Sequence, residues 1–155
     1  MELFAAGYAI LVVIVYAAIS GLWVESNSVW YRSLKRPPWQ PPNFLFGLIW
    51  PYNFFVLGLA GVLVSLNAEL NESFLWLVTL SVSVIFALAW SWDFYKNKKL
   101  MRASIWLGLT ALTTLGLLIS ISSLYPPMFW WLVPYQLWLI TATSLSTGYA
   151  VLNSK

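Results

Sequence analysis

The chain has 155 residues, of which 61% are hydrophobic and only 8% are charged, and its formal net charge is +3. Such a composition leaves too little polar surface to cover a soluble globule of this size, so it excludes a soluble domain and favours a membrane protein. The small positive charge is expected to mark orientation in a membrane rather than to recruit nucleic acid.

Five apolar stretches are each long enough to cross a bilayer as a helix, which takes roughly 20 residues. In chain order they cover about residues 3–23, 44–66, 74–95, 104–124 and 129–152. The hydrocarbon core offers no water to backbone groups, and the stretches lack the alternation of a membrane barrel, so they are expected to be helices. The sequence therefore predicts an all-α membrane protein in which residues 1–155 form a single domain, one bundle of five transmembrane helices.

The cations lie on one side of this predicted bundle. They fall in the first and third connections and at the C-terminus, at Arg32, Lys35, Arg36, Lys96, Lys98, Lys99, Arg102 and Lys155, whereas Glu2, Glu69 and Glu72 fall on the other side. By the positive-inside rule, this multi-pass integral membrane protein is expected to have its N-terminus outside and its C-terminus in the cytoplasm. No cation precedes the first span, which is therefore expected to be retained rather than cleaved as a signal peptide.

The connection between the first two spans is long and ends in a stiff segment. Pro37, Pro38, Pro41 and Pro42 surround Trp39. Because proline fixes φ and favours extended geometry, the segment is expected to hold Trp39 in place, with Pro42 starting the next helix. This pattern favours a lid over a site in the bundle, and a rigid cap that merely seals the bundle is the alternative.

Missing residue types exclude several kinds of chemistry. The chain has neither Cys nor His, and so it lacks thiolate nucleophiles, disulfides and the commonest general base and metal ligand. We therefore expect no metal site and no hydrolytic or metal-dependent catalysis. Asp93 lies near the end of the third span, three residues before Lys96, and the two are expected to form an interfacial ion pair rather than a proton relay.

Tryptophan is unusually frequent, with 11 residues in the chain. Trp23, Trp76, Trp130 and Trp131 lie toward the ends of spans, where indole rings commonly anchor helices at the lipid headgroups. We expect these four to form such anchors.

Another group of aromatic residues fits that role less well. Trp50, Trp90 and Trp138 lie in or near the cytoplasmic halves of their spans. On the last span, one helical face carries Tyr135, Trp138, Ala142, Leu145 and Tyr149 at spacings of three and four. This face indicates either helix packing or the wall of a pocket for a flat apolar ligand, and the spacing alone does not separate the two.

Three segments share a pattern with one known family of membrane proteins. The pattern W-Y-x-x-L-x-K-P-x-W-x-P-P, followed by a Gly and a Val/Ile-Trp pair, is met by Trp30, Tyr31, Leu34, Pro37, Trp39, Pro41, Pro42, Gly47, Ile49 and Trp50, with Arg36 at the usual Lys. The segments "AWSWDFY" and "PYQLW" are similar to L-N-x-x-W-S/A-x-x-F-F and P-Y-x-x-W of the same family. The chain thus resembles the TspO/MBR family of tryptophan-rich sensory and translocator proteins over nearly its whole length. The resemblance includes the five-helix count and the orientation.

Two positions depart from the family pattern. The asparagine of the third-span Leu-Asn pair is replaced in Phe86-Ala87, and that of the fifth-span pair in Leu145-Ser146. Each change removes a side chain that both donates and accepts hydrogen bonds. If family ligands use those amides, this chain is expected to prefer a different ligand or to bind less selectively.

The resemblance implies a pocket under the first connection that accepts tetrapyrroles such as protoporphyrin IX and, in some members, sterols. The ligand-binding residues that we expect are Trp30, Tyr31, Arg32, Lys35, Arg36, Trp39, Pro41, Pro42, Trp50, Phe54, Ala87, Trp90, Tyr135, Trp138, Ala142 and Leu145. Among these, the three cations could pair with the propionates of the macrocycle. Without His or Cys, a metal-free porphyrin is favoured over haem, and porphyrin is expected as a ligand while no cofactor is required.

The leading hypothesis is a membrane protein that binds tetrapyrroles and acts as a sensor, scavenger or stress regulator. One alternative is a transporter of porphyrin or sterol, although the chain lacks the internal repeat of most transporters. The other is an enzyme that degrades porphyrin with light and oxygen, for which the resemblance implies Trp50 and Trp138 as catalytic residues.

A homodimer is also expected, because members of the family form dimers. Ser83, Ala87 and Ser91 make a row of small residues on the third span, which lets helix backbones approach closely in lipid. We predict that this row is the dimer face, and packing within the bundle is the alternative.

Overall fold

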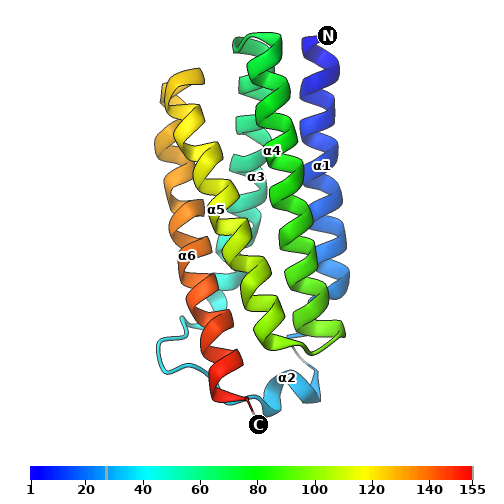
Figure 1. Ribbon diagram of the computed structural model, residues 1–155, viewed down its shortest axis with the longest axis vertical. Helices are drawn as coiled ribbons and strands as arrows, with labels where there is room; N and C mark the ends of the chain where they lie inside the picture. The colour runs from blue at the N-terminus through cyan, green and yellow to red at the C-terminus, as the bar shows by residue number, and fades with distance from the viewer. Residues whose placement is uncertain (27, 155) are drawn as a thin grey trace.

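The computed structural model describes residues 1–26 and 28–154, and over that part of the chain it is built from helices without strands. Five long helices run side by side as a bundle: α1 (Glu2–Trp23), α3 (Asn43–Asn67), α4 (Leu70–Ser91), α5 (Leu100–Leu124) and α6 (Phe129–Leu152) (Figure 1). Three short elements connect them: α2 (Val29–Ser33), the π-helical turn η1 (Trp92–Lys96) and the 3₁₀ turn η2 (Pro126–Met128). The all-helical prediction is confirmed.

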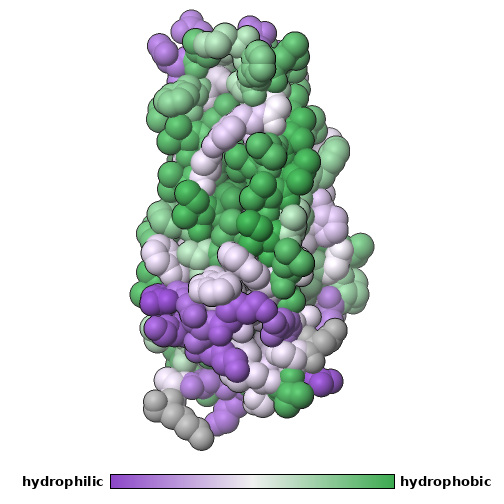
Figure 2. Space-filling model, turned by 90° about the vertical axis from the view of Figure 1, so that its right-hand side faces the viewer, coloured by the Kyte–Doolittle hydropathy of each residue, from purple (hydrophilic) through white to green (hydrophobic). Residues whose placement is uncertain are grey.

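The hydropathy of the helices agrees with a membrane protein. Within the described ranges, four helices are long and apolar enough to cross a bilayer, namely α1, α3, α4 together with η1, and α5. The fifth long helix, α6, has 24 residues and no charged side chain, but its Trp, Tyr, Pro, Gln, Ser and Thr residues lower its hydropathy below that of the other four. Apolar side chains cover the middle of the face seen in Figure 2. The predicted span limits lie close to those of the helices.

Charged side chains separate to the two ends of the bundle. The end that carries α2 and the α4–α5 connection holds Arg32, Lys35, Arg36, Lys96, Lys98, Lys99 and Arg102, and Figure 2 shows a hydrophilic band toward this end. Glu2, Glu69 and Glu72 lie at the opposite end, where α1 and α4 begin. The predicted charge separation is therefore present, except that Lys155 lies outside the described residues.

Helix α4 begins four residues before the predicted third span because its first turn is capped. Glu69 and Glu72 form a capping box. The Glu69 carboxylate accepts the backbone N–H of Glu72, and the Glu72 carboxylate accepts the backbone N–H of Glu69. A capping box satisfies donors that a helix start otherwise leaves unpaired, so polar residues can extend an apolar helix toward water.

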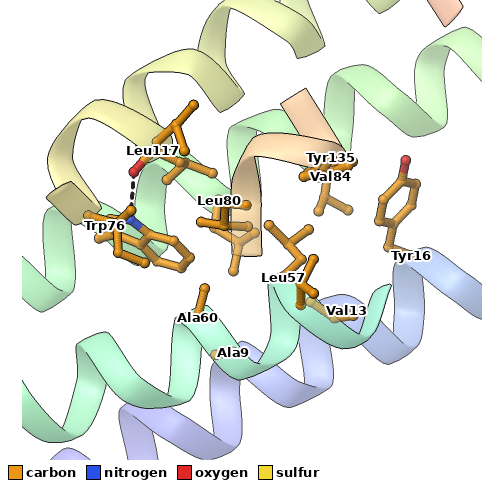
Figure 3. Packing of buried hydrophobic residues seen from close by; sticks show 14 of the residues in the cluster. Ala9, Val13, Tyr16, Leu57, Ala60, Trp76, Leu80, Val84, Leu117 and Tyr135 are labelled. Carbon is orange, nitrogen blue, oxygen red and sulfur yellow. Dashed lines mark hydrogen bonds between the residues drawn. The ribbon is translucent and has the colours of Figure 1, made fainter. Parts of the chain in front are cut away.

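The core runs along the axis of the bundle and draws on all five long helices. Figure 3 shows Ala9, Val13 and Tyr16 of α1 facing Leu57 and Ala60 of α3, with side chains of α4, α5 and α6 closing the cluster. The helices approach closely where small residues meet. A Cβ added to Gly61 would lie 2.6 Å from the Cβ of Ala9, so glycine is required there for α1 and α3 to pack at this distance.

Trp76 belongs to this core, and the prediction that it anchors the bundle at the headgroups is wrong. Its side chain is 2% exposed, and its Nε1–H donates to the backbone oxygen of Leu117 at 3.4 Å (Figure 3). The indole can be buried because that hydrogen bond satisfies its one donor. By contrast, Trp130 is 74% exposed, as expected of an anchor.

The row of small residues on α4 also lies inside the molecule. Ser83, Ala87 and Ser91 are all buried, and the hydroxyl of Ser83 is 2.9 Å from that of Thr114 on α5. The row therefore packs within the bundle, which was the alternative to a dimer face. The predicted dimer face is wrong, because a second copy cannot reach these residues.

Candidate functional site

A cavity of about 380 Å³ lies at the α2 end of the bundle. Its volume falls in the range of small-molecule sites, roughly 300 to 1,000 Å³. The residues that line it are Val24, Ser26, Tyr31, Arg32, Arg36, Gln40, Asn43, Phe46, Trp50, Trp90, Phe94, Tyr95, Trp138, Ala142, Leu145, Ser146 and Tyr149. They come from α3, α4, η1 and α6 and from the connection that contains α2, so the long first connection closes one side of the cavity.

Three tryptophans from three helices form the apolar wall. The rings of Trp50 on α3 and Trp90 on α4 are stacked, with centroids 6.2 Å apart and planes at 19°. Trp138 on α6 meets Trp50 nearly at a right angle, at 6.5 Å, and Phe46 meets Trp138 edge-on at 5.1 Å. The wall therefore offers flat surfaces in two orientations, which suits contact with a planar ligand.

The π-helical turn η1 brings two further aromatic residues to the cavity. Phe94 and Tyr95 are both buried and line it, with their ring centroids 4.9 Å apart. Tyr149 of α6 packs edge-on against Phe94 at 5.6 Å, and its hydroxyl lies 3.2 Å from that of Tyr31. The Tyr149 hydroxyl also donates to Oε1 of Gln40, so a short hydrogen-bonded chain joins α6 to the first connection.

Two arginines stand at the mouth of the cavity. Arg32 and Arg36 line it and are exposed to solvent, and neither forms a salt bridge with any described residue. The two side-chain carboxylates described at this end pair with other cations, since Glu25 pairs with Lys96 and Asp93 pairs with Arg102. The charge of the mouth is therefore positive, as a site for an anionic group requires.

The predicted ion pair between Asp93 and Lys96 is wrong. Asp93 is buried and accepts from the guanidinium of Arg102, from Nε1 of Trp106 at 2.9 Å and from Nδ2 of Asn97 at 2.7 Å. Residues three apart lie close together on one face of a regular α-helix, but Asp93 and Lys96 lie in the π-helical turn η1, which is wider. The carboxylate instead fastens the end of α4 to the start of α5.

Half of the predicted ligand-binding residues line the cavity. They are Tyr31, Arg32, Arg36, Trp50, Trp90, Trp138, Ala142 and Leu145. The aromatic face of the last span therefore serves both in helix packing and as a pocket wall, the two alternatives that the sequence left open. Tyr135 at one end of that face belongs to the core, and the residues from Trp138 onward line the cavity.

The other predicted residues do not line the cavity. Phe54 stacks behind Trp50 at 5.9 Å, and Trp30 packs edge-on against Phe94 at 6.1 Å. Ala87 is in the core, and the backbone of Lys35 is hydrogen-bonded to Asn153. Pro41 and Pro42 lead into α3, where Pro42 is the cap residue, as predicted.

Trp39 lies against α6 and does not line the cavity. Its Nε1–H donates to the hydroxyl of Ser144 at 3.0 Å. A Cβ added to Gly148 would lie 2.8 Å from Cγ of Pro37 and 2.9 Å from Cζ2 of Trp39, so these two rings rest directly on the glycine. The prolines do hold Trp39 in place, but the residues of the connection that line the cavity are others: Val24, Ser26, Tyr31, Arg32, Arg36 and Gln40.

Nine lining residues were not among the predicted ones: Val24, Ser26, Gln40, Asn43, Phe46, Phe94, Tyr95, Ser146 and Tyr149. Phe94 and Tyr95 stand in a recognised motif, and Tyr149 lies on the face that carries Trp138, so the sequence held a signal for these three. The polar residues of the first connection carry no pattern of their own, and only the fold brings them to the mouth.

The two departures from the family pattern differ in position. Ala87 lies in the core, away from the cavity. Ser146 lines the cavity, and its hydroxyl accepts a hydrogen bond from Nε1 of Trp90 at 3.3 Å. Only the second departure therefore alters a cavity wall. There the side chain of Ser146 is smaller than asparagine and is hydrogen-bonded to Trp90.

Comparison with known proteins agrees with this architecture. The sequence profile of the TspO/MBR family matches residues 9–152. The tryptophan-rich protein TspO of Bacillus cereus is 32% identical over 134 residues, which cover 86% of this chain and 87% of the relative. The protein CrtK of Rhodobacter capsulatus is 32% identical over 84% of this chain and 82% of its own length, and the translocator protein of Ovis aries is 28% identical over 76% and 70%. A match of this extent shows that the chain belongs to the TspO/MBR family.

Proposed function

We propose that this protein binds a tetrapyrrole, of the kind of protoporphyrin IX, in the cavity at the α2 end and acts as a membrane sensor, scavenger or stress regulator. One observation carries the proposal: three indoles form the wall of a cavity whose mouth holds two arginines without a carboxylate partner among the described residues. The names of relatives, a tryptophan-rich sensory protein and a translocator protein, agree with a role in sensing or moving a ligand.

The physical argument depends on matching two parts of the ligand to two parts of the site. A porphyrin is a flat apolar macrocycle, and stacked indoles such as Trp50 and Trp90 offer it parallel surfaces. Its two propionates lie on one edge of the macrocycle, where Arg32 and Arg36 can pair with them in charge-assisted hydrogen bonds. Lys35 is not needed in this arrangement, because its side chain does not line the cavity.

Replacing Arg32 and Arg36 together by glutamine is expected to weaken protoporphyrin IX binding about threefold to tenfold at low salt. The dimethyl ester offers no carboxylate, so its affinity is expected to stay within a factor of about two. Titration followed by the absorbance of the porphyrin measures both, and the effect on the acid should shrink as salt is raised.

The double variant Lys98→Gln and Lys99→Gln is the matched control. It removes the same charge from the same end of the bundle, but neither lysine lines the cavity. Equal losses for acid and ester in the arginine variant, or an equal loss in the lysine control, would remove the two arginines from the site.

Light-dependent degradation of porphyrin is a second candidate function. The two indoles that would act, Trp50 and Trp138, both line the cavity with ring centroids 6.5 Å apart, so both can contact one bound macrocycle. Product formation under light and oxygen would identify an enzyme. Flux of porphyrin or sterol into sealed proteoliposomes would instead identify a transporter.

We also propose that α6 is a fifth transmembrane helix, with the N-terminus outside and the C-terminus in the cytoplasm. The support is that α6 packs along α5 over its length and that the described cations gather at the end where α6 finishes (Figure 1). A tag placed after Lys155 is expected to be protected from a membrane-impermeant label in intact cells, and a tag ahead of Met1 is expected to be labelled. The reverse pattern would show the opposite orientation, and labelling of both tags would exclude a fifth span.

We still propose a homodimer, but the predicted dimer face no longer belongs to this proposal. Any second copy has to meet a surface other than the row at Ser83, Ala87 and Ser91, because that row is buried.

A further inference from the structure

The last turn of α6 holds the first connection by its backbone. Asn153, which follows the end of α6, accepts the N–H of Lys35 on its Oδ1 at 2.9 Å and donates from Nδ2 to the carbonyl oxygen of Lys35 at 3.0 Å. The same Nδ2 also donates to the backbone oxygen of Tyr149 at 2.9 Å. One carboxamide thus satisfies both backbone groups of a residue that lies outside any helix, as a neighbouring strand would.

Further contacts continue this attachment along the connection. Trp39 donates to Ser144, Gln40 accepts from Tyr149, and Pro37 lies on Gly148. Every one of these partners is on α6. The segment from Lys35 to Gln40 is therefore fixed to a single helix, and Asn153 provides the attachment nearest to its start.

Arg36 is the residue that this attachment places. It follows Lys35 directly, and Pro37 comes next, so its backbone lies between the Asn153 hydrogen bonds on one side and the ring on Gly148 on the other. Its side chain has no salt bridge within residues 1–26 and 28–154 that would orient it, yet it lines the mouth of the cavity. The region that the guanidinium can reach therefore depends on where the backbone of Arg36 is held.

We propose that Asn153 is a positioning residue for ligand selection, which favours ligands with carboxylates because it holds the backbone beside Arg36 at the mouth. Asn153 does not line the cavity, so we expect it to act without touching the ligand. The inference rests on the proposed function, since it concerns the same cavity and the same anionic ligand.

The test compares Asn153→Leu with the wild-type protein, using protoporphyrin IX and its dimethyl ester as probes at low salt. Leucine has a similar size but cannot form the hydrogen bonds to Lys35. The affinity for the acid is expected to fall about two- to fivefold, and that for the ester to change less than about 1.5-fold. A purely structural role would weaken both ligands alike, so equal losses would overturn the proposal while leaving the proposed function intact.

Asn67→Leu is the matched control. Asn67 ends α3 at the opposite end of the bundle, and its Nδ2 donates to the backbone oxygen of Leu63 at 2.8 Å, as Asn153 does to Tyr149. It contacts no part of the first connection among the described hydrogen bonds, so the ratio of acid to ester affinity is expected to match the wild type. A change in this ratio equal to that of Asn153→Leu would overturn the proposal.

A double-mutant cycle with Arg36→Gln tests whether Asn153 acts through Arg36. The double variant is expected to bind the acid no more weakly than Arg36→Gln alone, because a residue that acts through Arg36 has nothing left to position. Additive losses would overturn the proposal. If Asn153→Leu does not fold, Asn153→Ser replaces it in the same cycle. The expected result is the same: the double variant binds the acid no more weakly than Arg36→Gln alone. Failure of the wild-type protein to bind either porphyrin would overturn the proposed function and this inference together.

Discussion

Replacing Trp138 by alanine is expected to weaken protoporphyrin IX binding by about 5- to 150-fold, which corresponds to roughly 1 to 3 kcal/mol. Trp138 closes the wall on the side of α6, where it meets Trp50 and Phe46 nearly at right angles. Its loss removes stacking area and leaves the other two rings without their neighbour. Because the variant changes tryptophan fluorescence directly, binding is best followed by the absorbance of the porphyrin.

Trp130→Ala provides a matched control, since it removes the same side chain from the same helix. Trp130 is largely exposed and does not line the cavity, so its loss is expected to leave the affinity unchanged. Trp138→Phe keeps an aromatic ring of smaller area and should bind with intermediate affinity. Wild-type affinity in Trp138→Ala would assign the aromatic face of α6 to helix packing alone.

The second large effect is expected from Gly148→Ala. The new methyl group would lie within 3 Å of two rigid rings, those of Pro37 and Trp39, neither of which is a flexible side-chain end that can move aside. Overpacking of this kind costs about 1 to 3 kcal/mol, and the cheapest relief is for the connection to lift from α6. We expect faster trypsin cleavage after Lys35 in the detergent-solubilised protein and a red-shifted emission from Trp39.

Gly116→Ala controls for the substitution itself. Gly116 lies inside α5, and a Cβ added there would meet nothing within 4 Å. Alanine is a better helix former than glycine, so this variant is expected to be neutral or to gain up to about 1 kcal/mol in stability. Equal cleavage rates in Gly148→Ala, Gly116→Ala and the wild type would show that the close contact at Gly148 does not hold the connection.

Hydrophobicity predicted the helices well, because an apolar run in lipid has to pair its backbone groups internally and therefore forms a helix. The limits of α1, α3 and α6 follow the apolar runs within about one residue. Hydropathy gave no indication of the capped start of α4, which depends on two glutamates in a polar stretch. Composition likewise gave no sign of the π-helical turn, in which the buried carboxylate of Asp93 accepts from Asn97, Arg102 and Trp106.

The aromatic wall and the two arginines of the mouth were predictable, and the uncharged polar residues of the mouth were not. Trp50, Trp90 and Trp138 stood out because indoles inside spans lack the headgroup role that explains the others. Trp76 was misassigned for a related reason, since nothing in its position near the end of a span reveals a buried hydrogen bond to α5. Ser26, Gln40 and Asn43 reach the mouth only through the path of the first connection. Their place depends on contacts with α6 that span more than 100 residues of sequence.

The modest hydropathy of α6 has a consequence for how the protein is made. Its hydroxyl and amide groups fasten the first connection, line the cavity and reach α5, where Nε2 of Gln136 donates to the backbone oxygen of Ala111 at 3.1 Å. A helix of such modest hydropathy is poorly suited to partition into lipid alone, and its neighbours satisfy several of its polar groups. We therefore expect α6 to enter the bilayer only once α5 is in place. The insertion of α6 is then also the step that closes the cavity, so a nascent chain has no cavity to fill until α6 has been made.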